Sequence, residues 1–426
     1  MPTTARVARI HEYGPPEVLR FEDIVVGEPG DDEALIRNTV IGLNFVDVYY
    51  RRGSLPVPAF PAIIGDEAAG VVEAVGKNVK NVSVGDRVVY GDIAFGAYAT
   101  ARLHPADRLV RIPAGVSDDQ AASAFLKGLT ARYLLKEVLE LRPGDTVLYH
   151  AAAGGVGQIF VQWAKALGLK VIGTVSSDAK AKLARHAGCD HVINYSSEDF
   201  VAEALAFTAG NGVAAVFDSV GADTFRGSLA VLRPRGTLVQ FGKASGSPEP
   251  VDPFELAPRA LYLTWPILPH YTSTAEDLAI AAADLFDAIA TGILKVDPSN
   301  LYPFSQLIEA HHDLEERRTT GAAVLRVTAA GSPLIKFHAL QRPKAPAASS
   351  GQSWHLCGGI ESQAGGAVSN VKNIHQLPGD PDNPGGQRFV PSSPTPRRFG
   401  CQKRQSAGRD TTPSPDPRRL PTLRSG

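Results

Sequence analysis

The sequence predicts an α/β protein that combines a β-rich, barrel-like unit with a doubly wound parallel sheet and ends in a disordered tail. Three observations predict it. Short runs rich in β-branched residues, separated by Gly, Pro and Asp, fill roughly the first 110 residues. Strands then alternate with helices of about ten residues, which is typical of right-handed βαβ units. From Gly331 onward neither the helical nor the strand period is present.

The β-rich unit is expected to contain four strands: Ala5–His11, Ala34–Leu43, Ala69–Val75 and Arg87–Tyr90. The run Val84-Gly-Asp-Arg-Val reads as a turn that leads into the last of them.

The second part is expected to alternate between the two element types. Its helices are 117–140, 156–167, 179–187 and 198–208, and its strands are 146–150, 170–174, 191–194, 213–218 and 237–241. Helices over Asp277–Ala290 and Ser305–Arg317 and a strand over Ala323–Val327 close the folded part. We expect this closing part to return to the β-rich unit, so that the parallel sheet is an insertion.

The tail differs from the rest in charge and composition. The whole chain has 43 Lys and Arg against 44 Asp and Glu, but the residues from Gly331 onward hold 13 against 5, with 13 of the 32 prolines. The near-neutral net charge is therefore a cancellation between a basic tail and an acidic remainder. Because the tail has few large apolar residues to offset its ordering entropy, we expect disorder. It lacks interleaved aromatic residues, so RNA binding is disfavoured and an extension without function is favoured.

Other features exclude whole classes of protein. No run of about 18 apolar residues predicts a membrane span. Met1–Gly14 has no apolar signal core, so we expect a cytoplasmic protein. Three cysteines cannot form a disulfide scaffold or a four-thiolate zinc lobe.

A glycine-rich turn between a predicted strand and a predicted helix indicates dinucleotide binding. Ala152, Gly154 and Gly157 occupy the three positions of the G-x-G-x-x-G pattern, with Gly155 and Val156 between them. The pattern provides a tight turn, a backbone that can approach a pyrophosphate, and close contact between helix and strand. The pyrophosphate would lie at the helix N-terminus.

The next strand predicts the type of dinucleotide. An NAD-binding site would place a carboxylate about 20 residues further on, at the ribose 2′-hydroxyl. Here the strand ends in Ser176 and Ser177, and Lys180 follows. Hydroxyl donors and a cation suit a 2′-phosphate, so NADPH is favoured over NADH.

Several further runs carry a family resemblance. They are Ile41-Gly-Leu-Asn-Phe-Val-Asp, Gly65-Asp-Glu-Ala-Ala-Gly-Val-Val, Val84-Gly-Asp-Arg-Val, Phe125-Leu-Lys-Gly-Leu-Thr, His150-Ala-Ala-Ala-Gly-Gly-Val-Gly, Asp218-Ser-Val-Gly and Arg317-Arg-Thr-Thr-Gly. Over about residues 5–327 the chain resembles the zinc-free quinone oxidoreductases, the ζ-crystallin-like branch of the medium-chain dehydrogenases/reductases.

The resemblance implies a domain organisation. A GroES-like catalytic domain would comprise residues 1–125 and 262–328, and a Rossmann NADPH-binding domain residues 126–261, with the tail over 329–426. NADPH would lie in the cleft between the two domains. The resemblance also implies a homodimer or a tetramer.

The resemblance implies roles for particular residues. Ser176, Lys180 and Arg317 would contact the 2′-phosphate, and Tyr195 would line the adenosine pocket. The backbone and nicotinamide-side contacts would come from Thr130, Gly154, Val156, Ser219, Phe241 and Gly242. Asn44 and Tyr49 would be the hydrogen-bond donors of the substrate pocket, with Tyr49 either a proton donor or an aromatic wall.

Zinc is not expected. Zinc-dependent relatives carry Gly-His-Glu where this chain has Gly65-Asp66-Glu67, and a Cys on the early loop where it has Asn44 to Asp47. Only Cys189 lies outside the tail, and a zinc site needs three or four ligands. His311 and His312 are adjacent on a predicted helix, so their side chains diverge. Asp66 also departs from the Thr that is common in close quinone reductases.

Without zinc, alcohol oxidation is disfavoured and hydride transfer from NADPH to an electron-poor π-system is favoured. A quinone is the first expected acceptor and an α,β-unsaturated carbonyl (enone or alkenal) the alternative. A third reading is a crystallin-like or RNA-binding protein without turnover. Which quinone is used, and whether one or two electrons pass per step, stays open.

Overall fold

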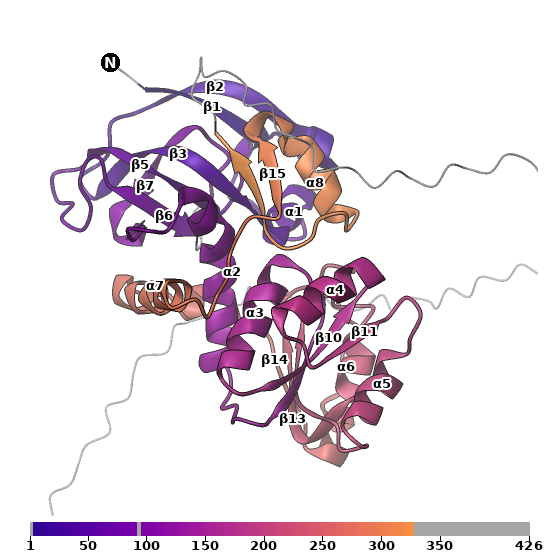
Figure 1. Cartoon of the computed structure of the whole chain (residues 1–426). Coiled ribbons are helices and arrows are strands. Elements are labelled where there is room, and N and C mark those ends of the chain that lie inside the picture. Colours follow the sequence, from indigo (N-terminus) through magenta and orange to yellow (C-terminus); the bar gives the residue numbers. More distant parts are fainter. Residues whose placement is uncertain (1–2, 92–94, 328–426) are drawn as a thin grey trace, which may run out of the picture. The chain divides into compact units, whose positions relative to one another are not determined.

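The structure of this chain is a computed structural model, which describes residues 3–91 and 95–327 (Figure 1). The predicted disordered tail, 329–426, lies outside the described residues. None of the helices in the part described is long and apolar enough to cross a membrane.

The N-terminal part folds into antiparallel sheets. Its strands are β1 (Thr3–Ile10), β2 (Leu19–Val26), β3 (Glu33–Leu43), β4 (Ala62–Ile63), β5 (Glu67–Val75), β6 (Arg87–Gly91), β7 (Ala101–Pro105) and β8 (Val110–Arg111). β1 pairs with β2 and β4 in one sheet. In the other, β3, β5, β6 and β8 lie side by side in that order, and β7 pairs with β3.

The end of the described chain completes that second sheet. β15 (Asn300–Pro303) pairs with β16 (Ala323–Arg326), and β16 runs antiparallel to β3. Between them lie the one-turn helix η5 (Phe304–Gln306) and α8 (Leu307–Glu315). The return of the chain to the β-rich unit is therefore confirmed.

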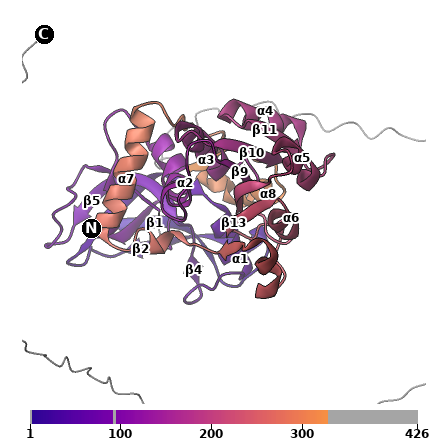
Figure 2. The ribbon, with the colours of Figure 1, turned by 90° about the horizontal axis from the view of Figure 1, so that it is seen from below.

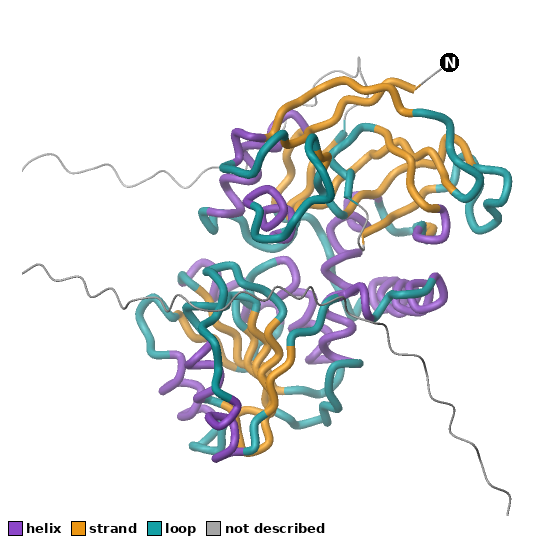
Figure 3. Tube along the Cα trace, turned by 180° about the vertical axis from the view of Figure 1, so that it is seen from behind, coloured by secondary structure: helices purple, strands orange, loops and turns teal. Residues whose placement is uncertain are grey.

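The middle of the chain forms a parallel sheet of the order β11-β10-β9-β12-β13-β14. The strands are β9 (Thr146–Tyr149), β10 (Lys170–Val175), β11 (His191–Asn194), β12 (Val213–Asp218), β13 (Leu232–Gln240) and β14 (Tyr262–Thr264). The helices are α3 (Gly155–Ala166), α4 (Asp178–Ala187), α5 (Phe200–Phe207) and α6 (Phe225–Ala230). α3 packs with α4 and α5 with α6, and Figure 3 shows helices on both sides of the strands. The doubly wound fold is confirmed.

Helix α2 (Asp118–Lys136) joins the two sheets. It packs against β5 and β6 of the antiparallel sheet and against α3 of the parallel one. The long helix α7 (Ala275–Ala290) lies beside it (Figure 2). One buried cluster runs through this junction and includes Phe125 of α2, Tyr149 of β9 and Phe160 of α3. The shared core fixes both sheets to the same helix.

Several elements differ from the sequence-based expectation. Strand β14 begins at Tyr262 and pairs with β13, so the predicted domain boundary between residues 261 and 262 falls too early. The predicted helix 117–140 ends at Lys136, before the turn at Pro143 and Gly144. Helix α1 (Phe45–Arg52) was not predicted. It forms because the Asp47 carboxylate accepts a hydrogen bond from the Asn44 backbone N–H, which caps the helix.

Histidine 104, on β7, is a buried group that the unfolded chain would expose. Its Nδ1 lies 2.9 Å from the Pro105 carbonyl oxygen, and its ring centroid 4.4 Å from that of Tyr90. Burial, with the nearby Arg102 charge, lowers the pKa of His104 to about 3. The imidazole is therefore neutral in the folded protein at any pH above that value.

We expect acid to destabilise the fold through His104. Between pH about 6.5 and 3 the unfolded chain binds a proton on this imidazole and the folded chain does not, so acidification favours unfolding. The free energy of unfolding should fall by about 1.4 kcal/mol per pH unit from this residue. Urea unfolding at pH 7.5, 5.5 and 4.5 should give a shallower pH dependence for His104→Gln than for wild type. His270→Gln, at an exposed position, is the control. Equal slopes in wild type and His104→Gln would contradict the assignment.

Candidate active site

The glycine-rich turn follows β9 and leads into α3. Ala151 has φ +58°, and the Gly154 N–H donates to the Ala151 carbonyl at 2.9 Å, which closes a tight turn. A Cβ on Gly157 would lie 2.6 Å from that carbonyl oxygen, so only glycine fits there. Ala152 is accepted at the first motif position because it lies against Gly173 of β10.

The start of α3 can hold an anion. Its N-cap is Gly154, so no side chain caps the helix, and the first backbone N–H groups keep their capacity to donate. Together with the positive end of the helix dipole, these groups suit a phosphate. Gly154, Gly155 and Val156 are half-buried there.

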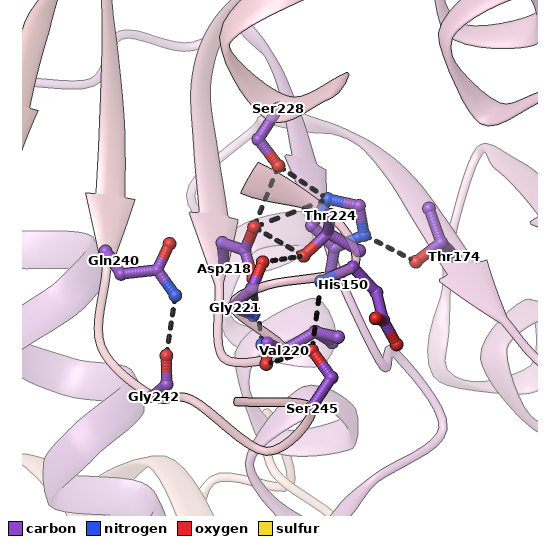
Figure 4. A network of polar contacts seen from close by, with 11 residues as sticks. His150, Thr174, Asp218, Val220, Gly221, Thr224, Ser228, Gln240, Gly242 and Ser245 are labelled. Atoms are coloured by element: carbon purple, nitrogen blue, oxygen red, sulfur yellow. Dashed lines mark hydrogen bonds and ion pairs between the residues drawn. The ribbon is translucent and has the colours of Figure 1, made fainter. Parts of the chain in front are cut away.

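A buried network fixes the strand ends around this turn (Figure 4). The Asp218 carboxylate accepts hydrogen bonds from the Ser228 hydroxyl (2.8 Å) and the Thr224 hydroxyl (2.7 Å). Because the only hydroxyl hydrogen of Ser228 goes to Asp218, Nε2 of His150 must donate to Ser228, at 3.0 Å. Nδ1 then accepts from the Thr174 hydroxyl at 2.8 Å. Burial lowers the pKa of His150, so this neutral form persists.

The four residues expected at the adenosine end lie near the ends of β10 and β11. The Lys180 ammonium donates to the Arg317 carbonyl oxygen at 2.7 Å. Ser176 precedes α4, and its carbonyl accepts from Ser196. Tyr195 follows β11, is 37% exposed, and donates its backbone N–H to Val175. Burial and the Arg317 charge lower the pKa of Lys180. The Arg317 guanidinium also lies 4.0 Å from the Asp223 carboxylate, and an anion bound here would be attracted to both cations.

The segment that carries Arg317 returns to the glycine-rich turn. Arg317 has φ +59°, and four residues later the Gly321 N–H donates to the Ala153 carbonyl at 2.9 Å. A parallel bridge pairs Gly321 with Gly154. The Arg-Thr-Thr-Gly run and the glycine-rich turn are thus neighbours in space, although about 160 residues separate them in the chain.

Three expected nicotinamide-side residues meet after β12 and β13. A Cβ on Gly242 would lie 2.7 Å from the Ser219 carbonyl oxygen, so the two segments are in close contact. The Phe241 N–H donates to the Asp218 carbonyl at 2.9 Å. The Gln240 side chain donates to the Gly242 carbonyl at 2.6 Å. The loop after β13 is therefore held against the loop after β12.

Tyr49, on α1, reaches this loop. Its phenol oxygen accepts a hydrogen bond from the Lys243 backbone N–H at 2.8 Å. Burial raises the pKa of Tyr49 to about 12, so the hydroxyl stays protonated near neutral pH. Within residues 3–91 and 95–327 no acceptor takes the hydroxyl hydrogen, which leaves it for a bound molecule.

Asn44 is held by a buried ion pair. Its Nδ2 donates to the Glu67 carboxylate at 2.8 Å, and the Lys127 ammonium donates to the same oxygen at 3.0 Å. The Leu126 N–H donates to the other oxygen at 2.7 Å. Nδ2 carries a second hydrogen that this arrangement does not use.

The sequence analysis missed Lys127 and Lys243. A lysine within the apolar run Phe125-Leu-Lys-Gly-Leu was a signal for Lys127, because a buried lysine needs a partner. Nothing in the sequence indicated that Lys243 lies against Tyr49. Thr130, another expected residue, lies on α2. Its hydroxyl donates to the Leu126 carbonyl of its own helix, at 2.8 Å.

In the part of the chain that is described, no group of three or more His, Cys, Asp and Glu side chains gathers as a metal site would require. His311 lies in the core, where its Nε2 is 2.9 Å from the Tyr98 hydroxyl, whereas His312 is 2.7 Å from Glu17. Burial raises the pKa of Cys189 to about 12, so this thiol is a poor metal ligand.

Two family descriptions match the chain. Residues 30–114 match the alcohol dehydrogenase GroES-like domain, and residues 155–282 match the zinc-binding dehydrogenase family. The ligands that the second name implies are not brought together among the described side chains.

Relatives that match about three quarters of the chain belong to a narrower group of enzymes. A quinone oxidoreductase of Pseudomonas aeruginosa is 46% identical over 314 residues, which cover 74% of this chain and 97% of that protein. A 2-haloacrylate reductase of a Burkholderia species is 43% identical over 326 residues, covering 75% and 98%. The crystal structure of Escherichia coli quinone oxidoreductase complexed with NADPH has a TM-score of 0.74 and 44% identity, and covers 76% of this chain and 100% of that one.

Proposed function

The chain belongs to the quinone oxidoreductase family of the medium-chain dehydrogenases/reductases, and we propose that it reduces quinones with NADPH. The observation that carries the proposal is the continuous arrangement from the Lys180–Arg317 pair, through the uncapped start of α3, to the hydroxyl of Tyr49. The GroES-like catalytic domain would then comprise residues 1–125 and 265–327, and the nucleotide-binding domain residues 126–264.

The site fits NADPH at three places. The first place is the glycine-rich turn, in which a Cβ on Gly157 would be too close to the backbone. The turn consists of Ala152, Gly154, Gly155, Val156 and Gly157. The adjacent cations Lys180 and Arg317 suit a 2′-phosphate, with Ser176 and Tyr195 beside them. Ser219, Phe241 and Gly242 would contact the nicotinamide side. The relative from Escherichia coli was solved with NADPH, which supports the same assignment here.

When bound, NADPH supplies a hydride, and the protein's own groups have to orient the acceptor. Tyr49 would donate its hydroxyl hydrogen to the acceptor oxygen, because the Lys243 N–H already occupies one lone pair of the phenol. Asn44 would donate its second amide hydrogen, with the amide held in place by Glu67. Such fixed donors stabilise the negative charge that develops on the acceptor oxygen.

We propose that the reaction does not use zinc. The family resemblance implies that zinc-dependent relatives carry a His where this chain has Asp66 and a Cys on the early loop, which here (Asn44 to Asp47) has none, and the described residues do not assemble a ligand set. Metal analysis of purified active protein should find less than one zinc per ten chains. Stoichiometric zinc that is needed for activity would contradict this.

An enone or acrylate reductase is the second candidate, and the 2-haloacrylate reductase among the relatives favours it specifically. A panel of ortho-quinones, para-quinones and enals separates the two activities by steady-state NADPH oxidation. A silent panel combined with tight NADPH binding would indicate the third reading, a binding protein without turnover. The cytoplasmic location remains a prediction from the sequence.

Lys180→Ala should shift cofactor preference. Loss of a cation beside the 2′-phosphate should raise KM for NADPH by roughly 10- to 100-fold and leave KM for NADH within about twofold. Lys182→Ala, at an exposed position two residues away, is the matched control. The measurement is kcat/KM with both cofactors. An unchanged NADPH-to-NADH ratio in Lys180→Ala would remove Lys180 from the site.

Tyr49→Phe should lower kcat/KM for a quinone by about tenfold, because one hydrogen bond to the developing oxyanion is lost. The dissociation constant for NADPH, measured by fluorescence titration, should stay within about twofold. Tyr50→Phe is the control, since the Tyr50 ring packs edge-on against Phe95. Equal kcat/KM in wild type and Tyr49→Phe would show that Tyr49 is only an aromatic wall.

We propose a homodimer formed at the edge of the parallel sheet. β14 is the last strand in that sheet, and its outer edge has no partner strand within the described residues. Large apolar side chains are exposed there: Phe254 (84%), Tyr262 (57%), Leu263 (40%), Trp265 (46%) and Ile267 (46%). An exposed apolar edge strand is a ready site for pairing with a second copy.

Sedimentation velocity should report a dimer for wild type and a monomer for Trp265→Glu, because burying a carboxylate at the interface is unfavourable. Ile280→Glu, on the exposed face of α7, should remain dimeric. A wild-type monomer at micromolar concentration would rule out the dimer.

A further inference from the structure

Two polar groups of Lys243, its backbone N–H and its side-chain ammonium, lie close to Tyr49. Its backbone N–H binds the Tyr49 oxygen at 2.8 Å, and its ammonium nitrogen lies 5.9 Å from the centroid of the Tyr49 ring. The same nitrogen donates to the Ser54 carbonyl at 3.3 Å, just beyond the end of α1. The lysine therefore connects the loop after β13 to α1, next to the side chain proposed to bind the acceptor.

The charge of Lys243 is not neutralised by any carboxylate of residues 3–91 or 95–327, since its ammonium makes only the carbonyl and ring contacts. The side chain is half-buried, which reduces the screening of its charge by water. Neither hydride transfer nor the hydrogen bond from its backbone needs an ammonium group at this position.

Acidic side chains lie near Tyr50, the residue that follows Tyr49 in α1. Burial raises the pKa of the Tyr50 hydroxyl, and the nearby Asp66 and Asp47 raise it further. Tyr49 and Tyr50 are successive residues of a helix, so their side chains point about 100° apart. Tyr49 thus lies beside an ammonium group, whereas Tyr50 lies near two carboxyl groups.

We propose that Lys243 makes the site selective for electron acceptors that carry a negatively charged group, a carboxylate on a quinone or on an α,β-unsaturated carbonyl. The ammonium would bind the carboxylate, while Tyr49 binds the acceptor oxygen. The inference rests on the proposed function. A relative named for 2-haloacrylate, a small unsaturated carboxylate, shows that this class of acceptor is compatible with the family.

The test compares two acceptors that differ at one group, which is charged in the first and neutral in the second: a naphthoquinone with a propionate side chain and the methyl ester of the same quinone. kcat/KM is measured for both acceptors at low ionic strength and in about 0.5 M KCl, because high salt screens the interaction between charges. The variants are Lys243→Met, which keeps the backbone bond to Tyr49, and Lys243→Arg, which keeps the charge. Lys80→Met, at an exposed position before β6, is the control.

Wild type should prefer the carboxylate, and Lys243→Met should lower the ratio of the two kcat/KM values, carboxylate over ester, by about tenfold. Lys243→Arg and Lys80→Met should keep the wild-type ratio. Added salt should reduce the ratio in wild type and in these two variants, which retain a cation at position 243, but not in Lys243→Met. An equal ratio in wild type and Lys243→Met, or a ratio insensitive to salt in wild type, would overturn the inference.

Two outcomes separate this inference from the proposed function. Turnover of the neutral ester with NADPH supports quinone reduction whether or not Lys243 selects for charge. If neither quinone is reduced, the proposed function fails, and equilibrium binding of the propionate quinone to wild type and Lys243→Met still decides the role of Lys243. If Lys243→Met does not fold, the salt dependence of wild type and the Lys243→Arg ratio decide it.

Discussion

The site depends on the ion pair and the hydrogen bonds that the buried carboxylate of Glu67 makes. It is fully buried at the start of β5 and accepts hydrogen bonds from the Asn44 amide, the Lys127 ammonium and the Leu126 N–H. Removing one partner of a buried ion pair typically costs about 3–5 kcal/mol, because the other charge is left unpaired. One carboxylate thereby holds together the antiparallel sheet, the start of α1 and helix α2.

The same ion pair extends to the glycine-rich turn. A Cβ on Gly155 would lie 2.9 Å from the Lys127 side chain, so the lysine stem packs directly on the first residue of α3. Lys127 therefore spans from Glu67, beside the proposed acceptor pocket, to the start of the helix that would bind pyrophosphate. One lysine side chain thus contacts both halves of the site.

Hydrogen-bonded networks, rather than single residues, give the nucleotide-binding half its shape. Asp218 receives the hydroxyls of Thr224 and Ser228, and the backbone N–H groups of Val220 and Gly221 bind its other oxygen. The Gly221–Gly246 bridge then ties the loop after β12 to the loop that carries Lys243. A buried network in which every polar atom of His150 and Asp218 has a partner rigidifies the loops that it joins.

Periodicity and local motifs were enough to predict the alternating strands and helices and the glycine-rich turn. These features depend on contacts within one or two turns of chain, or on the burial pattern of a single element. Helix α1 escaped prediction because Asn44 and Asp47 act as a cap only where β3 ends. The boundary that the family resemblance implied, between residues 261 and 262, separates β14 from the parallel sheet, in which it pairs with β13.

The sequence by itself determined the kind of dinucleotide site, since a Gly-rich turn and a lysine without a nearby carboxylate are local properties of the chain. Only the tertiary structure decided what surrounds the acceptor. Lys243 and Tyr49 are 194 positions apart, and Lys127 and Glu67 are 60 apart. Such pairs exist because a shared core brings α2, β5 and the loop after β13 together, and no local pattern encodes that long-range packing.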